Sequence, residues 1–247
     1  MKVKKGDMYI SIVLLFLLMS GFSSNVHAVG YQNGIKTNDE LIWNCHFCDD
    51  NKMDELFGEF WNDAGIFENL STNRRMKWRL NMVEENSTTL SALFSIWMWR
   101  VEDNWGAQDN NSKILYLKNP ILYPSGFNFT NTLPFIPFWL PVPVGEYLGE
   151  IPLGEIYDVD NRVLPTLNVQ ITKDSIHHNE PTETVYFIAV YNTNGILSSF
   201  KLYTSGNVVI VDISLESLPI IAIVSTIGLV LAFVCSIVLY IKKKRIN

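Results

Sequence analysis

The 247-residue sequence is poor in cysteine and, over most of its length, in basic residues. Cys45 and Cys48 are close together, and the third cysteine, Cys235, stands near the C-terminal end. Three of the 19 basic residues fall in the first five positions and four are the run Lys242–Arg245, so residues 29–216 hold 12 against 24 acidic residues. Such an acidic segment repels phosphate backbones, which argues against nucleic acid as a partner.

Motifs of the common enzyme classes are also missing. Residues 29–216 contain no G-x-S-x-G, H-E-x-x-H, P-loop or G-x-G-x-x-G pattern. The sequence therefore predicts no catalytic residue, no metal site and no cofactor, and it favours a binding protein over an enzyme.

Long apolar runs are confined to the two ends of the chain. Residues 1–28 combine basic MKVKK, an apolar run over Met8–Phe22 and a small-residue exit at Val26-His27-Ala28, which is typical of a signal peptide. The run is shorter than the roughly 20 residues that a bilayer core requires, so we expect cleavage; an uncleaved anchor is the alternative.

The second apolar run, 218–241, has 24 residues and no charged side chain. As a helix it would be about 36 Å long, enough to cross a bilayer. The basic residues after it predict that the tail, 242–247, is cytoplasmic and that residues 29–216 lie outside the plasma membrane. Small residues recur at every fourth position of the run: Gly228, Ala232 and Ser236. They could form a helix-pairing face and a homodimer, although small residues are common in such helices.

The extracytoplasmic segment has room for one substantial core. Apolar residues alternate with polar ones, or fill both faces, in stretches typical of strands: 75–82, 89–101, 113–118, 185–191, 196–204 and 208–215. Short turn sequences join the last three into an antiparallel meander. Helical spacing predicts a helix over 52–64. The expected fold is a β-rich α+β domain, an antiparallel sheet with one or two helices, followed by one C-terminal transmembrane helix.

The stretch LPFIPFWLPVPV, residues 133–144, is apolar and has four prolines. Proline lacks a backbone donor, so the strip cannot form a regular helix or a central strand. Since the last strand ends near Leu215 and the apolar run begins at 218, the domain should lie close to the bilayer. Phe135, Phe138 and Trp139 are therefore candidates for contact with the membrane or with an apolar ligand. The alternative is that the strip folds over its own sheet as a lid.

Cys45 and Cys48 occur in the sequence WNCHFCDD. Outside the cytoplasm they are expected to form a local disulfide. Thiol redox activity is disfavoured because Asp49 and Asp50 follow directly and would raise the pKa of a nearby thiol. A zinc site that also uses a histidine is a third possibility, but no complete set of four ligands is visible.

Several stretches resemble those of single-pass, membrane-anchored surface proteins of archaea. They are RMKWRL, PVGEYLGE, YDVDNRVLPT and GILSSFKLYTSGN, set between a signal peptide and an apolar helix with a lysine tail. The resemblance covers most of the chain and implies location and architecture; it carries no assigned activity and no functional residue.

These observations favour a non-enzymatic binding or interaction module at the cell surface, with membrane lipid and an unknown protein or apolar ligand as partners. The second hypothesis is an extracytoplasmic carrier or chaperone for a lipid, which would use a curved sheet and the 133–144 strip. A thiol-disulfide oxidoreductase of the cell envelope is the third.

Overall fold

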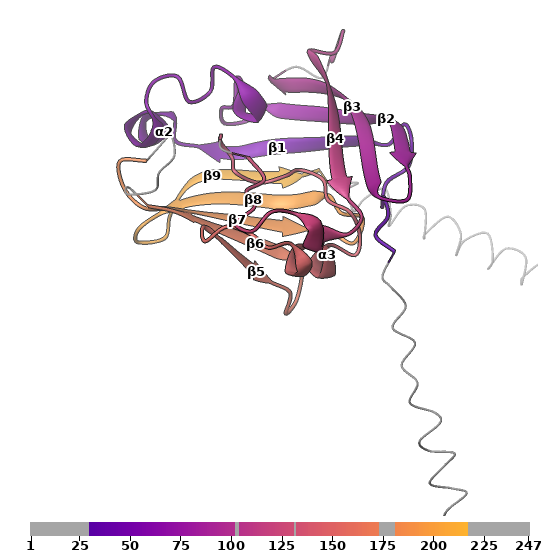
Figure 1. Ribbon diagram of the computed structural model, residues 1–247. Helices are drawn as coiled ribbons and strands as arrows, with labels where there is room; N and C mark the ends of the chain where they lie inside the picture. Colours follow the sequence, from indigo (N-terminus) through magenta and orange to yellow (C-terminus); the bar gives the residue numbers. More distant parts are fainter. Residues whose placement is uncertain (1–29, 102–103, 131, 173–180, 217–247) are drawn as a thin grey trace, which may run out of the picture. The chain divides into compact units, whose positions relative to one another are not determined.

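The computed structural model describes four stretches of the chain, 30–101, 104–130, 132–172 and 181–216 (Figure 1). The chain divides into two compact units, Met1–Gly30 and Tyr31–Asn247, and every described helix and strand lies in the second.

The predicted signal peptide, 1–28, lies outside the described residues. So do the predicted membrane span, 218–241, with Gly228, Ala232 and Ser236, and the tail, 242–247. Within the part of the chain that the structure describes, no helix is long and apolar enough to cross a membrane.

Nine antiparallel strands form one sheet in the order β4-β3-β2-β1-β9-β8-β7-β6-β5 (Figure 1). Their bounds are β1 Glu40–Cys48, β2 Arg75–Glu85, β3 Thr89–Arg100, β4 Asn110–Leu117, β5 Tyr157–Asp160, β6 Thr166–Ile171, β7 Val185–Tyr191, β8 Leu197–Thr204 and β9 Val208–Leu215. β2 to β4 form one meander and β5 to β9 another. β1 joins the two, because it pairs with β2 on one side and with β9 on the other.

The β-rich fold is confirmed, and six strands fall where alternation predicts them. The helices are α2 Asp50–Phe57 and α3 Val144–Glu150, with 3-10 turns η1 Gly65–Phe67 and η2 Pro120–Leu122. The helix predicted over 52–64 is too long. α2 ends at Phe57 because Gly58 has φ of 88°, outside the helical region, and caps the helix with its N–H on the Asp54 carbonyl.

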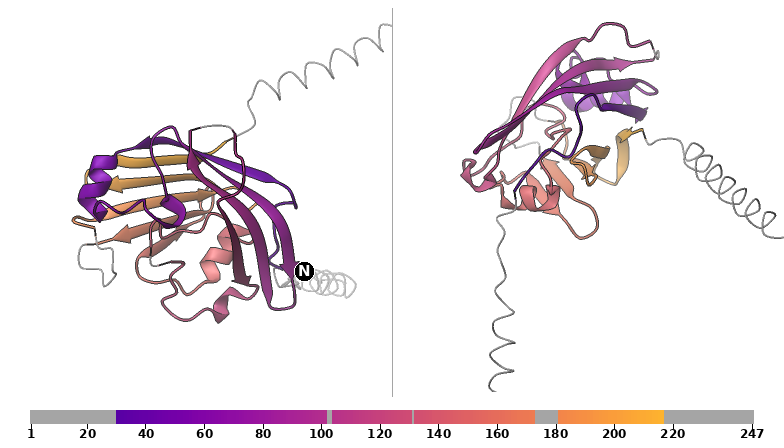
Figure 2. Two further views of the ribbon diagram at one scale, coloured as in Figure 1. Left: turned by 90° about the horizontal axis from the view of Figure 1, so that it is seen from above. Right: turned by 90° about the vertical axis from the view of Figure 1, so that its right-hand side faces the viewer.

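The sheet bends, so that its two meanders lie on either side of the loops that fill its inner face (Figure 2). The 133–144 strip is the centre of this filling. Phe138 packs between Trp43 of β1 and Trp78 of β2, with ring centroids 5.2 and 5.5 Å away. Phe135 contacts Phe187 of β7 at 5.8 Å, so the strip touches both halves of the sheet.

The backbone of the strip is satisfied by tyrosine hydroxyls. Tyr157 donates to the carbonyl of Phe135 at 2.9 Å, Tyr191 to that of Pro137 at 2.8 Å and Tyr116 to that of Trp139 at 2.7 Å. The carbonyls of residues 135, 137 and 139 thus each have a partner on the sheet. Buried carbonyls need such partners, and prolines provide no N–H to pair elsewhere.

Phe135, Phe138 and Trp139 are therefore core residues in this structure, each no more than 2% exposed. Contact of these rings with a bilayer would require the strip to leave the sheet. The arrangement is that of a lid over the sheet, and an apolar-ligand contact stays a prediction, considered below for Phe138.

Candidate functional site

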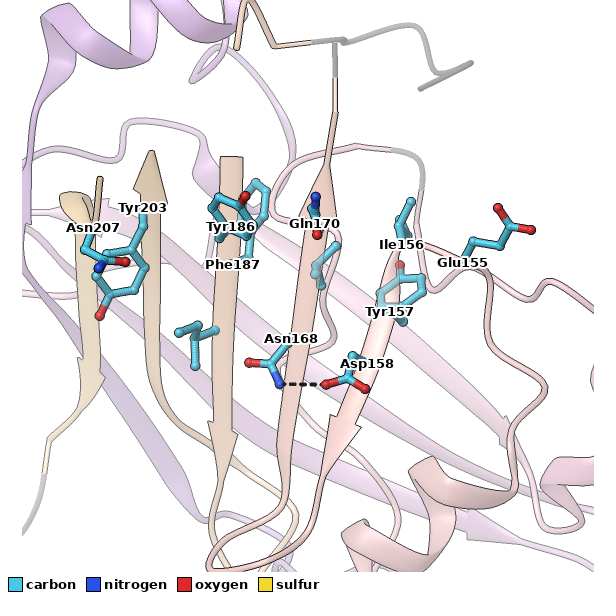
Figure 3. A pocket seen from close by; sticks show the side chains of 12 residues that line it. Glu155, Ile156, Tyr157, Asp158, Asn168, Gln170, Tyr186, Phe187, Tyr203 and Asn207 are labelled. Atoms are coloured by element: carbon cyan, nitrogen blue, oxygen red, sulfur yellow. Dashed lines mark hydrogen bonds between the residues drawn. The ribbon is translucent and has the colours of Figure 1, made fainter. Parts of the chain in front are cut away.

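A groove of about 660 Å³ lies on the outer face of β5 to β8, the face turned away from the strip (Figure 3). Strands β5, β6, β7 and β8 and the turns beside them build it. Its lining residues are Glu155, Ile156, Tyr157, Asp158, Asn168, Val169, Gln170, Tyr186, Phe187, Ile188, Tyr203 and Asn207.

Strand register brings the polar and aromatic side chains of the groove together. Gln170 of β6 pairs with Tyr186 of β7, and Tyr186 pairs with Tyr203 of β8. One step along the groove, Asn168 pairs with Asp158 on one side and with Ile188 on the other. Residues directly opposite one another in a sheet point to the same face, so each set forms a row across the strands.

Alternation along β7 separates this face from the core. Val185, Phe187, Ala189 and Tyr191 are buried, whereas Tyr186 is 38% exposed and Ile188 is half-buried. The groove thus offers a tyrosine ring and an aliphatic side chain to solvent from the strand that also supports the core.

The polar groups of the groove are amides and carboxylates. Asn168 Nδ2 donates to Asp158 Oδ2 at 3.5 Å, the contact drawn in Figure 3. Among the described lining residues, Glu155 and Asp158 are acidic and none is Lys or Arg. The groove can donate and accept hydrogen bonds beside aromatic faces, but it opposes an anionic ligand.

A second cavity, of about 390 Å³, lies between the strip and the β2–β4 half of the sheet. Its walls are mostly apolar or aromatic: Ile66, Trp78, Ile114, Leu115, Tyr116, Tyr123, Phe127, Phe129, Thr130, Thr132, Leu133, Pro134, Ile136, Pro137 and Phe138. The buried Nε1 of Trp78 donates no hydrogen bond to any described residue. An unpaired buried donor costs about 1–3 kcal/mol, so this indole contributes less to stability than a paired one would.

The two cysteines of β1 point to the same face of the sheet. In a regular strand residues three apart point to opposite faces, but the pairing of β1 with β9 shifts register between Cys45 and Phe47. The bulge leaves His46 and Phe47 exposed and both cysteines buried. The sequence does not reveal this bulge, which brings the two thiols together.

Both cysteines are free in this structure, and the disulfide stays a prediction. The Cys45 thiol donates to the Phe47 carbonyl at 3.3 Å. A hydrogen bond with Cys45, and then burial, raise the pKa of the Cys48 thiol. A raised pKa disfavours the thiolate that redox catalysis needs.

The basic side chains of β2 are used within the fold. Lys77 is buried, with Nζ 4.2 Å from the ring centre of Trp97 and 5.1 Å from that of Trp105. Arg79 lies over the same Trp97 ring at 5.5 Å. These cation–π contacts cover the basic face of β2.

Within the described ranges, no group of three or more His, Cys, Asp or Glu side chains is placed to hold a metal ion. In comparisons with known proteins, no family model, no curated protein and no solved structure matches this chain.

Proposed function

We propose that the protein is a membrane-anchored binding module of the cell surface, and that the groove on the outer face of β5 to β8 recognises a neutral or amino-bearing glycan. The observation that carries the proposal is the row Gln170, Tyr186 and Tyr203, in which two tyrosines stand beside an amide on one open face.

A saccharide fits the chemistry of this row. The apolar face of a pyranose ring packs on aromatic side chains, and its hydroxyls pair with groups that both donate and accept. Gln170 and Asn168 supply such amides, and Asp158 adds an acceptor. The two lining carboxylates favour neutral or cationic sugars over sulfated or phosphorylated ones.

The position of the groove suits recognition away from the cell. β9 ends at Leu215, close to the predicted membrane span, whereas Gln170, Tyr186 and Tyr203 lie toward the opposite ends of their strands. A membrane-anchored domain would therefore hold the groove away from the lipid surface.

The test is binding of the full chain, held in lipid nanodiscs, to an array of neutral, amino-bearing and acidic oligosaccharides. We expect binding to neutral or amino-bearing members. Tyr186→Ala and Tyr203→Ala should each weaken it about tenfold, which corresponds to about 1.4 kcal/mol.

The matched control is Phe60→Ala, which removes a ring that is 77% exposed but outside the groove. It should leave binding unchanged. Failure to bind any member, a preference for acidic members, or equal effects of the tyrosine substitutions and the control would contradict the proposal.

A carrier for an apolar ligand is the second candidate, and the 390 Å³ cavity under the strip supports it. Its volume suits a single acyl chain, and Phe138 and Trp78 are two of its walls. Native mass spectrometry of the full chain should then detect a bound lipid that is lost in Ile114→Trp, which fills the cavity. A spectrum with protein alone, or a lipid kept in that variant, would count against this function.

A further inference from the structure

The β5–β6 turn lies at the same end of the sheet as the end of β9. One row of paired residues crosses five strands: Ser214 of β9, Ser199 of β8, Val190 of β7, Thr166 of β6 and Asp160 of β5. β9 ends one residue beyond this row, at Leu215, and the turn 161–165 begins one residue beyond it. Four strand spacings separate the two points, about 19 Å.

The tip of this turn is apolar and open. Val163 is 92% exposed and Leu164 is 48% exposed. Ile121 and Leu122, which follow β4 at the same end of the sheet, are exposed as well, at 65% and 68%. On the β5–β6 turn, the two adjacent exposed aliphatic residues form a small interaction surface.

The turn is also held in a fixed conformation. Asn161 Nδ2 donates to the carbonyl of Gly145 in α3 at 2.9 Å, and the N–H of Tyr191 donates to the carbonyl of Pro165 at 2.9 Å. Thr166 Oγ1 donates to the Leu164 carbonyl at 2.9 Å. The aliphatic pair is thus presented by a braced turn.

The neighbouring charge is balanced. Arg162 forms an ion pair with Asp160, with Nη2 2.6 Å from Oδ2. This contact holds the pKa of Asp160 at about 2, so at neutral pH the two side chains carry opposite charges that cancel. Attachment of this tip to a surface would depend on Val163 and Leu164.

We propose that the β5–β6 turn inserts Val163 and Leu164 into the interfacial layer of the same bilayer that residues 218–241 are predicted to cross. The proposal rests on the membrane anchorage proposed above. Only residue 217 separates Glu216 from the apolar run, a reach of about 7 Å, so the end of β9 cannot stand far from the lipid. A bilayer is therefore the surface that this end meets.

Two contacts fix an orientation that one tether leaves free. With β9 and the β5–β6 turn both at the lipid, the row from Ser214 to Asp160 runs parallel to the membrane. The row of Gln170, Tyr186 and Tyr203 then stands about 13 Å farther out, since Gln170 is four residues beyond Thr166 along β6. Insertion would thus keep the groove facing outward.

The experiment places a nitroxide at residue 163 by Val163→Cys in the full chain, with Cys235→Ser to remove the third cysteine; Cys45 and Cys48 are buried. The matched control is Val208→Cys, an exposed valine at the other end of β9. In phosphatidylcholine vesicles, the ratio of collisions with oxygen to collisions with an aqueous nickel chelate reports depth. We expect this ratio to be several-fold higher at residue 163 than at residue 208.

Flotation of the vesicles distinguishes failure of the proposed insertion from failure of the proposed membrane anchorage. Protein that floats, with equal ratios at residues 163 and 208, would overturn the insertion and leave the anchorage intact. Protein that does not float would overturn the anchorage and the insertion together. In floating protein, Leu164→Asp should lower the ratio at residue 163 toward that of the control, and no change there would also contradict insertion.

Discussion

The two faces of the β5–β9 half of the sheet use the same residue type in opposite ways. Tyr191, at the end of β7, is fully buried and donates its hydroxyl to the strip, whereas Tyr186, at the other end of the same strand, is exposed in the groove. Their positions differ by five, an odd number, so alternation places them on different faces. The position of a tyrosine along the strand, and not its residue type, therefore decides whether it stabilises the fold or is available to a ligand.

The inner face is closed by the chain itself. The strip fills it, and the hydroxyls of Tyr116, Tyr157 and Tyr191 pair with three of its carbonyls. The outer face has no comparable cover over Tyr186 among the described residues. Substitutions on the inner face should therefore change stability, and those on the outer face should change binding.

The largest expected effect is that of Trp139→Ala. This indole is fully buried and packs against Phe94 and Tyr116 at 5.8 and 5.3 Å. Its removal leaves a cavity in the centre of the inner face and should lower the free energy of unfolding by about 3–5 kcal/mol. Pulse proteolysis in denaturant measures this, with Phe60→Ala as a control that should change it by less than about 0.5 kcal/mol. Equal effects would mean that the strip does not support the fold.

The second largest effect is expected from alkaline pH, which should lower the free energy of unfolding through the buried tyrosines of the inner face. Burial raises the pKa of Tyr157 from 10.0 to about 12, and burial also raises the pKa values of Tyr116, Tyr147 and Tyr191. A raised folded-state pKa contributes stability that is complete below pH 10 and is lost as pH rises through the folded value. For Tyr157 the loss is about 1.4 kcal/mol per pH unit between pH 10 and 12.

Unfolding free energies measured from pH 8 to 12 check this, together with tyrosinate absorbance. A flat stability profile above pH 10, or full ionisation of all ten tyrosines near pH 10 in the folded protein, would contradict burial of these hydroxyls.

A smaller effect on stability is expected when one tyrosine hydroxyl is removed, and its size should differ between the two faces. Tyr191→Phe removes the hydroxyl that donates to the partly buried Pro137 carbonyl, so it should lower stability by about 0.5–1.5 kcal/mol. Tyr186→Phe removes an exposed hydroxyl and should change stability by less than about 0.5 kcal/mol. Denaturant midpoints of the two variants give the answer, and the reverse ranking would invert the assignment of faces.

The smallest effect is expected from the ion pair on the outer face between Lys201 of β8 and Asp212 of β9. Nζ and Oδ2 are 3.0 Å apart, and both side chains are partly exposed. Asp212→Asn should cost about 0.2–1 kcal/mol at low salt and less at 1 M salt. A salt-independent loss above about 2 kcal/mol would show that this face is as closely packed as the inner one.

Sequence pattern was sufficient for much of the sheet because period-two alternation is local. RMKWRL and VYFIAVY each form the strand that their spacing predicts. It failed for the helices, where short length or a single backbone angle decides. α3 is too short for its spacing to stand out, and the length of α2 is set by one backbone angle at Gly58.

The candidate groove could not be predicted from the sequence because long-range strand pairing builds it. Tyr186 and Tyr203 are 17 positions apart, and only the β7–β8 register makes them neighbours. The bulge that unites Cys45 and Cys48 likewise depends on the partner strand β9. For the strip, composition excluded helix and central strand, but the surface that it covers is revealed only by its ring contacts and by the three tyrosine hydroxyls.

Photo-crosslinking from the groove tests the central claim most directly. A photoreactive phenylalanine analogue replaces Tyr186 in one variant of the full chain and Phe60 in another, and each is irradiated with the oligosaccharide that binds best on the array. We expect adducts from position 186 and none from position 60. Equal yields at the two positions, or adducts at neither while binding persists, would show that the outer face of β5 to β8 is not the recognition surface.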